Sequence, residues 1–346
     1  MTTEQLIQNA RKMVAAGKGI IAADESANTC KKRFDAVGIE SNEENRRRYR
    51  QMLFTAPGIE EYVSGVILFD ETIRQSDDTG TPFPKLLAAK GILSGIKVDK
   101  GPVELALHTG EKITEGLDGL RERLAEYATL GAAFAKWRAV ITIEDGIPSE
   151  ACISTNAHVL ARYAALCQEA GIVPMIEPEV LIDGSHSIER CYEVTETVLE
   201  ECFEELEHQG VDLRATILKT SMVIAGNKSE KQSSPSEVAD ATVRVLQATV
   251  PHEIPGIVFL SGGQGDEQAT ANLNAMNRSA TLATNKPWPL TFSYSRAIQN
   301  PVLKKWAENP ETNVQAAQAA LLFRCNMNSL ASLGQYTEEM EKGRSY

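Results

Sequence analysis

The sequence contains no Cys-x-x-Cys pair and no clustered histidines. The six cysteines lie far apart, most of them in apolar segments typical of helices or strands: Cys30, Cys152, Cys167, Cys191, Cys202 and Cys325. This pattern predicts reduced core cysteines in a cytoplasmic protein rather than a disulfide framework. The five histidines include no pair four residues apart and no His-Glu-x-x-His motif. A helix-borne zinc motif is therefore excluded, although metal ligands could still converge in space.

Long apolar runs and an excess of basic residues are also missing. No run reaches the roughly 18 apolar residues that a membrane-spanning helix needs. Residues 1–19 have helical periodicity but lack the uninterrupted apolar stretch of a signal peptide. The chain has 35 Lys and Arg against 47 Asp and Glu, a formal net charge of -12. These features predict a cytoplasmic protein that binds neither membranes nor nucleic acid, and any anionic ligand must bind at a locally basic site.

Short strand-like runs alternate with helical segments along the whole chain. Eight such runs are found, at 19–24, 65–69, 95–99, 134–140, 172–179, 215–223, 256–261 and 289–294. This alternation is typical of a parallel α/β fold, and eight strands predict a (β/α)8 TIM barrel. We expect one domain over residues 1–346, with extra N-terminal helices and a helical C-terminus. Residues 337–346 are expected to form a mobile C-terminal tail.

Several helix ends can be predicted from their capping residues. The segments 41–44 (SNEE) and 234–237 (SPSE) have the spacing of a capping box, the second with proline at the first helical position. The long helical pattern 189–208 is followed by Gly210, which predicts a C-terminal cap.

Lys219 lies in the apolar run 215–223, where a β-strand would bury it. A desolvated lysine near other cations has a lowered pKa, and its free amine can attack a carbonyl carbon to form a Schiff base. The alternative is a lysine whose stem is buried and whose ammonium reaches solvent at the strand end. For one lysine of unknown surroundings this alternative is favoured, so the neighbouring residues must decide.

Polar and charged residues stand at the ends of nearly all the predicted strands. Lys136 and Arg138 are two residues apart, as are Glu177 and Glu179, so each pair shares one face of its strand. Other strands end near Asp24, Lys97, Asp99, Lys219, Ser261, Ser293 and Arg296. A single pair could be a solvated strand end or a structural ion pair. Five basic side chains converging in an acidic protein instead indicate an anionic ligand, such as a phosphorylated sugar, and would lower the pKa of Lys219.

A glycine-rich turn, 259–265 (FLSGGQG), follows the seventh predicted strand. Backbone N–H groups at Gly262 and Gly263 could bind a phosphate there, at the position where TIM barrels often do so. Arg296, after the eighth strand, would complete the phosphate site. By itself such a turn more often merely connects a strand to a helix.

Together these segments resemble those of class I fructose-bisphosphate aldolases. The resemblance runs in order over nearly the whole chain, through 22–26 (AADES), 96–101 (IKVDKG), 134–138 (FAKWR), 177–179 (EPE), 217–219 (ILK), 259–264 (FLSGGQ) and 291–294 (TFSY). It implies reversible cleavage of fructose 1,6-bisphosphate to dihydroxyacetone phosphate and glyceraldehyde 3-phosphate through a lysine Schiff base. The protonated imine is an electron sink, so no metal and no cofactor are expected. A cytoplasmic homotetramer of glycolysis and gluconeogenesis is also implied.

The resemblance further implies roles for individual residues. Lys219 would form the Schiff base and Glu177 would be its general acid and base, supported by Glu179 and Lys136. Asp24 would take the proton of the C4 hydroxyl, and the terminal Tyr346 would help to move a proton to and from C3. Ser261, Gly262 and Arg296 would bind the C1 phosphate, Arg33, Lys97 and Arg138 would lie near the C6 phosphate, and Ser293 and Ser295 would also bind substrate.

The chain departs from the family's pattern at three places. Ser295 stands where glycine is common, 220–221 (TS) replaces a common Pro-Asn, and the tail is shorter than in animal enzymes. Two alternatives stay open: another Schiff-base sugar-phosphate aldolase or a transaldolase, and a non-catalytic scaffold with the same fold. The presence of Asp24, Glu177 and Lys219 argues against the scaffold, which has no need of buried charges.

Overall fold

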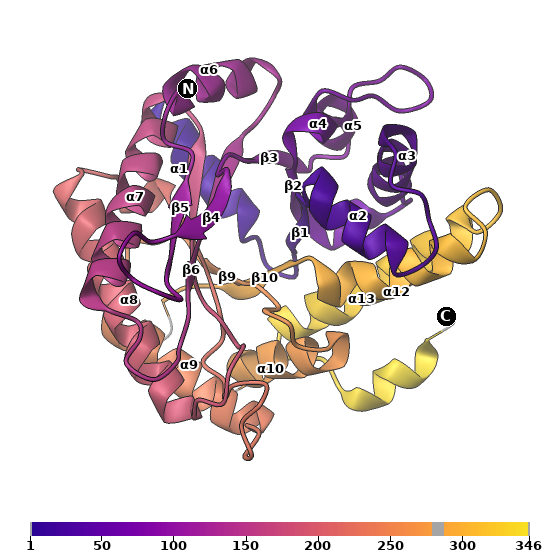
Figure 1. Ribbon diagram of the computed structural model, residues 1–346. Coiled ribbons are helices and arrows are strands. Elements are labelled where there is room, and N and C mark those ends of the chain that lie inside the picture. The colour runs from indigo at the N-terminus through magenta and orange to yellow at the C-terminus, as the bar shows by residue number, and fades with distance from the viewer. Residues whose placement is uncertain (1, 279–286, 345–346) are drawn as a thin grey trace.

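The computed structural model describes residues 2–278 and 287–344, and eight parallel strands form a closed barrel within them (Figure 1). In sequence order the strands are β1 (Gly19–Ala23), β2 (Val63–Leu68), β3 (Leu93–Lys97), β6 (Phe134–Ile141), β7 (Val173–Val180), β8 (Ile217–Thr220), β9 (Ile257–Phe259) and β10 (Leu290–Tyr294). Each strand pairs with its sequence neighbour in the barrel, and β10 closes the sheet on β1. The predicted TIM barrel and all eight of its strands are confirmed.

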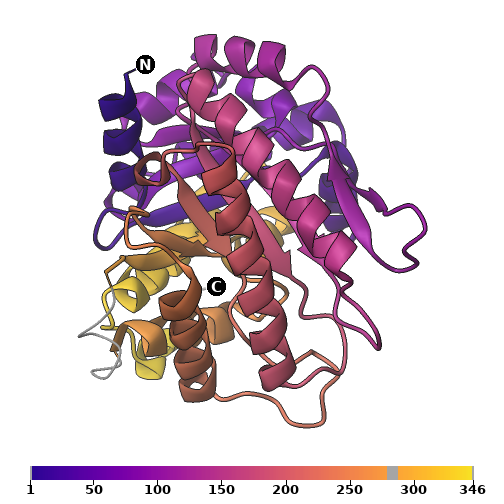
Figure 2. The same cartoon turned by 90° about the vertical axis from the view of Figure 1, so that its left-hand side faces the viewer.

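Helices cover the outside of the barrel, and the long helices α7, α8 and α9 stand side by side over the strands (Figure 2). The helices are α1 (Thr3–Met13), α2 (Ala27–Asp35), α3 (Glu43–Phe54), α4 (Asp70–Ile73), α5 (Phe83–Ala89), α6 (Leu120–Thr129), α7 (Glu150–Glu169), α8 (Ile188–His208), α9 (Pro235–Thr249), α10 (Asp266–Arg278), α12 (Arg296–Glu308) and α13 (Val314–Ser332). Short 3-10 helices occur at η1 (Ile59–Glu61), η2 (Leu213–Ala215) and η3 (Glu338–Gly343). None of the helices in the described ranges is long and apolar enough to cross a membrane.

The barrel interior changes from apolar to charged along the strands. At the end where the strands begin, α1 packs Leu6, Ala10 and Met13 against inward-facing residues such as Ile217. Because side chains on one face of a strand recur every second residue, Lys219 points to the same interior as Ile217 but one layer further on. In other strands too, the inward-facing residues are apolar near the start of the strand and charged near its end. The fold therefore directs charged side chains inward at the carboxyl ends of the strands.

Two details of the fold differ from the sequence-based expectations. The prediction of a capping box at 41–44 is wrong, because Asn42 rather than Ser41 caps α3 and accepts a hydrogen bond from the backbone N–H of Asn45. An antiparallel hairpin, β4 (Gly101–Glu104) and β5 (Lys112–Glu115), lies outside the barrel and was not predicted. The capping box at Ser234 and the cap at Gly210, whose φ is +68°, are confirmed.

The C-terminal segment contacts the body of the protein through ion pairs. Arg324 of α13 is fully buried, and its guanidinium binds both carboxylate oxygens of Glu341 at 2.7 and 2.8 Å. Arg344 pairs with Asp266, the first residue of α10, at 3.2 Å. These contacts place η3 beside the start of α10, close to the glycine-rich turn 261–265.

The six cysteines are buried and free, as the sequence predicted. Burial raises the pKa of Cys167, Cys202 and Cys325, which keeps these thiols in their neutral form. They act as small apolar residues of the core.

Candidate active site

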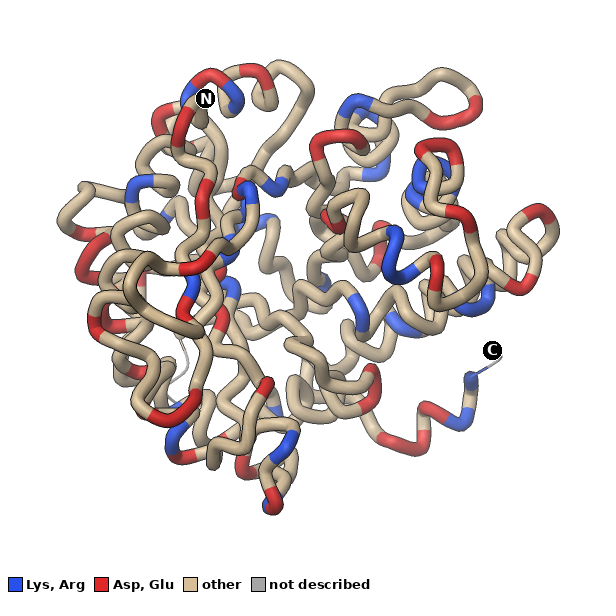
Figure 3. Tube along the Cα trace, viewed as in Figure 1, with Lys and Arg blue, Asp and Glu red and all other residues tan. Residues whose placement is uncertain are grey.

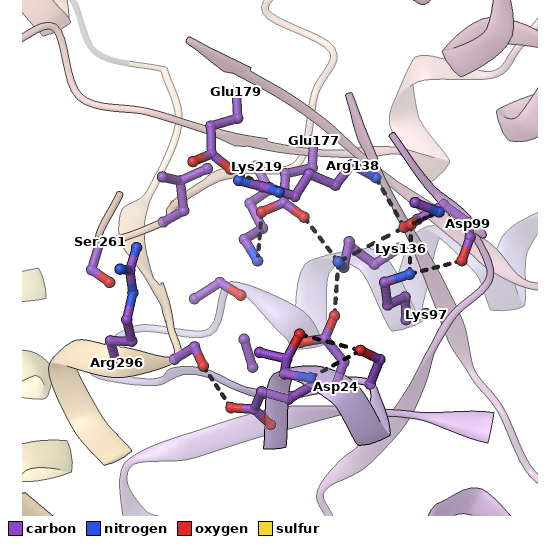
Figure 4. Close-up of a pocket in the computed structure, with 18 of the residues that line it drawn as sticks. Asp24, Lys97, Asp99, Lys136, Arg138, Glu177, Glu179, Lys219, Ser261 and Arg296 are labelled. Carbon is purple, nitrogen blue, oxygen red and sulfur yellow. Dashed lines mark hydrogen bonds and ion pairs between the residues drawn. The ribbon is translucent and has the colours of Figure 1, made fainter. Parts of the chain in front are cut away.

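A cavity of about 590 Å³ opens at the carboxyl ends of the barrel strands (Figure 4). Of the site residues expected from the sequence, Tyr346 lies outside the described residues and the others all line this cavity: Asp24, Arg33, Lys97, Lys136, Arg138, Glu177, Glu179, Lys219, Ser261, Gly262, Ser293, Ser295 and Arg296. The residues come from β3, β6, β7, β8 and β10 and from segments that follow the strands, such as Asp24 directly after β1. The fold thus collects side chains from distant parts of the sequence in one place.

Four charges, three of them buried and Asp24 partly exposed, form a chain across the cavity (Figure 4). Lys219 Nζ lies 3.0 Å from Glu177 Oε1, and the other carboxylate oxygen of Glu177 lies 3.3 Å from Lys136 Nζ. Lys136 Nζ continues to Asp24 Oδ2 at 2.7 Å. The exposed fraction of Lys136, Glu177 and Lys219 is only 3% each. Lysine and carboxylate therefore alternate in a site largely shielded from water, where charges interact strongly.

The surroundings of these groups determine their protonation. Burial raises the pKa of Asp24, but the ammonium groups of Lys136 and Lys219 outweigh it, so the pKa lies well below its usual range. Burial likewise opposes ionisation of Glu177, and Lys136 and Lys219 again bring the net pKa below the ordinary value. Burial favours neutral Lys136, yet Asp24, Glu177 and Asp99 raise its pKa overall. At neutral pH the centre of the cavity holds ionised Asp24 and Glu177 on either side of a charged Lys136.

Two further ion pairs flank the central chain. Arg138 Nε lies 2.5 Å from Glu179 Oε2, and Lys97 Nζ lies 2.5 Å from Asp99 Oδ1. Arg138 stays 37% exposed at the side chain, so its remaining donors can reach a ligand. In the described ranges no group of three or more His, Cys, Asp and Glu could hold a metal ion, since lysine and arginine alternate with the carboxylates.

The glycine-rich turn lies on the side of the cavity opposite Lys97 and Asp99 (Figure 4). Gly262 and Gly263 have φ of +55° and +95°, a left-handed conformation that favours glycine, and α10 begins three residues later. The Ser293 hydroxyl is buried and has no hydrogen-bond partner among the described residues. Arg296 likewise forms no ion pair within the described part of the chain. Figure 3 shows acidic and basic residues interspersed over the outer segments, with several basic ones also near the centre of the barrel. This side is open to an anion.

Sequence reasoning missed several residues of the cavity wall. They include Glu25, Thr29, Lys32 and Lys100, and Asp99, which was noted at a strand end but given no role. On α2, Thr29 lies four residues before Arg33, so helical spacing from Arg33 could have indicated Thr29. Lys32 is adjacent to Arg33, and helical spacing from Arg33 does not point to it. No local signal separates Glu25 from an exposed glutamate, because its partners come from elsewhere in the chain.

The structure shows how the chain is arranged at two of its departures from the family's pattern, Ser295 and residues 220–221. Ser295 has φ of -105°, outside the left-handed region, so the backbone here does not need glycine. Ser221 Oγ donates to the carbonyl of Val180 at 2.9 Å, which ties the end of β8 to the end of β7. This hydrogen bond holds the end of β8, which carries Lys219, close to β7, which carries Glu177.

This chain is similar to known proteins over nearly its whole length. The family model described as "Glycolytic: Fructose-bisphosphate aldolase class-I" matches residues 5–346. A probable fructose-bisphosphate aldolase class 1 of Xylella fastidiosa is 58% identical over 336 residues, 97% of this chain and 99% of its own. The cytosolic fructose-bisphosphate aldolase 6 of Arabidopsis thaliana is 52% identical over 340 residues, 98% of this chain and 94% of its own.

A solved structure gives the same result in three dimensions. The fructose-bisphosphate aldolase of Plasmodium falciparum, crystallised with TRAP and a small-molecule inhibitor, superimposes with a TM-score of 0.93 and 48% identity. The match covers 96% of this chain and 95% of the other. The residues matched by the family model, 5–346, include all eight strands of the barrel.

Proposed function

Because this chain belongs to the class I fructose-bisphosphate aldolase family, we propose that Lys219 is the nucleophile with which it cleaves its substrate. The activity is the reversible cleavage of fructose 1,6-bisphosphate to dihydroxyacetone phosphate and glyceraldehyde 3-phosphate. The observation that supports Lys219 most strongly is its buried Nζ, 3.0 Å from a carboxylate in a cavity with four other basic strand-end residues. A direct test of the activity measures both triose phosphates after incubation with the bisphosphate. Absence of either product would refute the assignment of this cleavage reaction to the protein.

In the first stage the amine of Lys219 attacks C2 of the substrate's ketone. Glu177, ionised in the free protein, takes a proton from the Lys219 ammonium and so releases the nucleophilic amine. A new C–N bond forms as the π bond of the carbonyl breaks, and the ketone oxygen becomes a hydroxyl by taking a proton from the attacking nitrogen. The protonated Glu177 then returns its proton to that hydroxyl, which leaves as water and produces a protonated imine. Glu177 can serve as both base and acid because its two oxygens face different lysines.

In the second stage the bond between C3 and C4 breaks. Asp24 accepts the proton of the C4 hydroxyl, the C4 oxygen forms the aldehyde of glyceraldehyde 3-phosphate, and the bonding electrons move to C3 and into the imine. Lys136 stands 2.7 Å from Asp24 and keeps it ionised before the proton arrives. Protonation of C3 and hydrolysis of the imine then release dihydroxyacetone phosphate and restore Lys219. The positive imine supplies the electron sink for this step.

The two phosphates of the substrate require cationic groups at both ends of the cavity. We assign the C1 phosphate to Ser261, Gly262 and Arg296, because left-handed glycines expose backbone N–H groups there. Lys97 and Arg138 are assigned to the C6 phosphate, on the side formed by β3 and β6. Arg33 is assigned to that end too, although its hydrogen bond to Ser295 places it beside the residue that precedes Arg296.

Variants at the two ends should lose different interactions. Arg296→Ala is expected to lower kcat/KM on both fructose 1-phosphate and the bisphosphate, because both carry the C1 phosphate. Arg138→Ala should affect mainly the bisphosphate. Removing one charge-assisted contact costs about 2 to 3 kcal/mol, roughly 30- to 150-fold. The control is Lys304→Ala, which removes an exposed cation of α12 outside this cavity. Equal losses on both substrates for both variants would contradict the assignment.

We also propose that the tail at 337–346 is mobile because its ion pairs with the body of the protein can break and re-form, and that Tyr346 takes part in proton transfer at C3. The two residues after Arg344 can extend about 7 Å, and Arg344 pairs with Asp266 just after the glycine-rich turn. Deleting Tyr346 should slow tritium exchange at C3 of bound dihydroxyacetone phosphate, while borohydride trapping of the Schiff base stays unchanged. Exchange at the normal rate would show that the tail is not catalytic.

The oligomer and the compartment are proposed from the family resemblance. We propose that the protein is a homotetramer. Measuring its molar mass in solution tests this directly. The Arabidopsis relative is named as cytosolic, and the buried free cysteines of this chain fit a reducing compartment. We propose the cytoplasm.

A further inference from the structure

Glu25 is a buried carboxylate of the cavity wall that the aldolase mechanism does not use. It follows Asp24 directly, yet its side chain has other partners and is only 5% exposed. Asp24 pairs with Lys136 at the centre of the cavity, whereas Glu25 pairs with Arg33 and Arg50. Burying a carboxylate is costly unless it is fully paired, so the contacts of Glu25 indicate what it holds in place.

Oε1 of Glu25 accepts three hydrogen bonds and Oε2 accepts one. Oε1 accepts from Ser295 Oγ at 2.8 Å and from Gln299 Nε2 at 2.9 Å, and it forms an ion pair with Arg33. Oε2 binds Arg50 Nη2 at 2.5 Å. Burial raises the pKa of Glu25, but Arg50 and Arg33 lower it by more. At neutral pH the carboxylate is therefore ionised, and its contacts join α2, α3 and the start of α12.

Arg33 is held by two of its nitrogens at once. Nη1 pairs with Glu25, while Nη2 donates to Ser295 Oγ at 3.1 Å. A guanidinium is planar, so two contacts at different nitrogens fix its orientation. Its side chain nevertheless remains 20% exposed and lines the substrate cavity. The donors that Glu25 and Ser295 do not occupy are left for a ligand.

We propose that Ser295 and Glu25 are positioning residues that hold Arg33 ready to bind a substrate phosphate. Ser295 was expected from the family resemblance to bind substrate itself, but its hydroxyl is bound to Glu25 and Arg33, so we assign it an indirect role. Neither residue needs to touch the phosphate or the reacting carbons. Their effect is to remove the entropy cost of ordering a long side chain when the phosphate binds. Ser295 is the residue at which the proposal can be tested, because its single hydroxyl links Glu25 to Arg33. Glu25 itself is a poor test site, since its removal leaves Arg50 buried without a counter-charge.

The experiment is a double-mutant cycle between Ser295 and Arg33. Ser295→Ala should raise KM for fructose 1,6-bisphosphate and the inhibition constant of inorganic phosphate about three- to tenfold, the effect of losing one hydrogen bond, with kcat unchanged. In the Arg33→Ala background the same Ser295→Ala change should have no further effect, because it acts only through Arg33. Ser295→Thr keeps a hydroxyl and should restore most of the affinity.

A second serine provides a matched control. Ser64→Ala also removes a buried hydroxyl, which donates to the carbonyl of Met13 at 2.6 Å outside the substrate cavity. It should lower the midpoint of thermal unfolding without changing either constant. The proposal is overturned if Ser295→Ala has the same effect with and without Arg33, if it tightens phosphate binding, or if Arg33→Ala alone changes nothing. Since every arm requires measurable cleavage by the unmodified protein, failure of the aldolase assignment would be recognised separately.

Discussion

Replacing Lys219 with arginine should abolish cleavage of fructose 1,6-bisphosphate, with a loss of roughly 10⁴-fold or more in kcat. Arginine preserves the positive charge beside Glu177 but cannot lose its proton in a protein, so it cannot attack C2. Because the site is buried, a second variant, Lys219→Met, removes the amine with a side chain of similar length. Both variants should lose cleavage, and phosphate binding through Arg296 should remain in both.

Borohydride reduction measures the same property directly. In the unmodified protein, dihydroxyacetone phosphate and borohydride should attach the triose covalently to Lys219 and inactivate it, because only an imine is reduced to a stable amine. Peptide mapping identifies the modified lysine, and Lys136 is the internal control, since it lies in the same cavity at the same burial. Label on Lys136, on another lysine, or on none would refute the assignment of Lys219.

The sequence was most informative where local chemistry and strand alternation act together. Lys136 with Arg138, and Glu177 with Glu179, could be placed on shared strand faces because the period of two is fixed by backbone geometry. The parallel barrel then brings all strand ends to one mouth, so the predicted cavity followed from the predicted fold. The glycine-rich turn was predictable for a similar reason, since few residues other than glycine adopt the φ of Gly262 and Gly263.

Contacts between distant segments could not be predicted in this way. Glu25 is bound by Ser295 and Gln299, more than 260 residues away, and no local pattern indicates that meeting. The sequence argument also surrounded Lys219 with cations, whereas the structure gives it a carboxylate partner. The hairpin β4–β5 was missed because its short, largely exposed strands carry no apolar period. The N-cap of α3 was placed one residue early because Ser41 and Asn42 are both good caps.

Loss of Lys136 should disturb three carboxylates of the cavity at once. Its ammonium lies 2.7 Å from Asp24, 3.3 Å from Glu177 and 4.0 Å from Asp99, all in a buried site. Lys136→Met would leave three carboxylates facing one another without their common counter-charge. Breaking a buried ion pair by removing one partner typically costs about 3 to 5 kcal/mol of unfolding free energy. Cleavage should fall by roughly 10³-fold or more, because Asp24 and Glu177 lose the ammonium that keeps them ionised.

The pH dependence of the unfolding free energy of Lys136→Met distinguishes the loss of a counter-charge from a simple loss of packing. In the unmodified protein Asp24 and Glu177 have lowered pKa values, so the stability they contribute is complete above their ordinary values of 3.8 and 4.5 and is lost as the pH falls through the lowered ones. Without Lys136, burial and mutual repulsion raise both pKa values, and the ionised carboxylates destabilise the folded state as the pH rises. The stability deficit of Lys136→Met should therefore be greatest near pH 7 and shrink towards pH 5, measured by urea unfolding. Lys304→Met, an exposed substitution on α12, should show no deficit at either pH. A deficit of equal size at both pH values would mean that Lys136 supports the fold through packing alone.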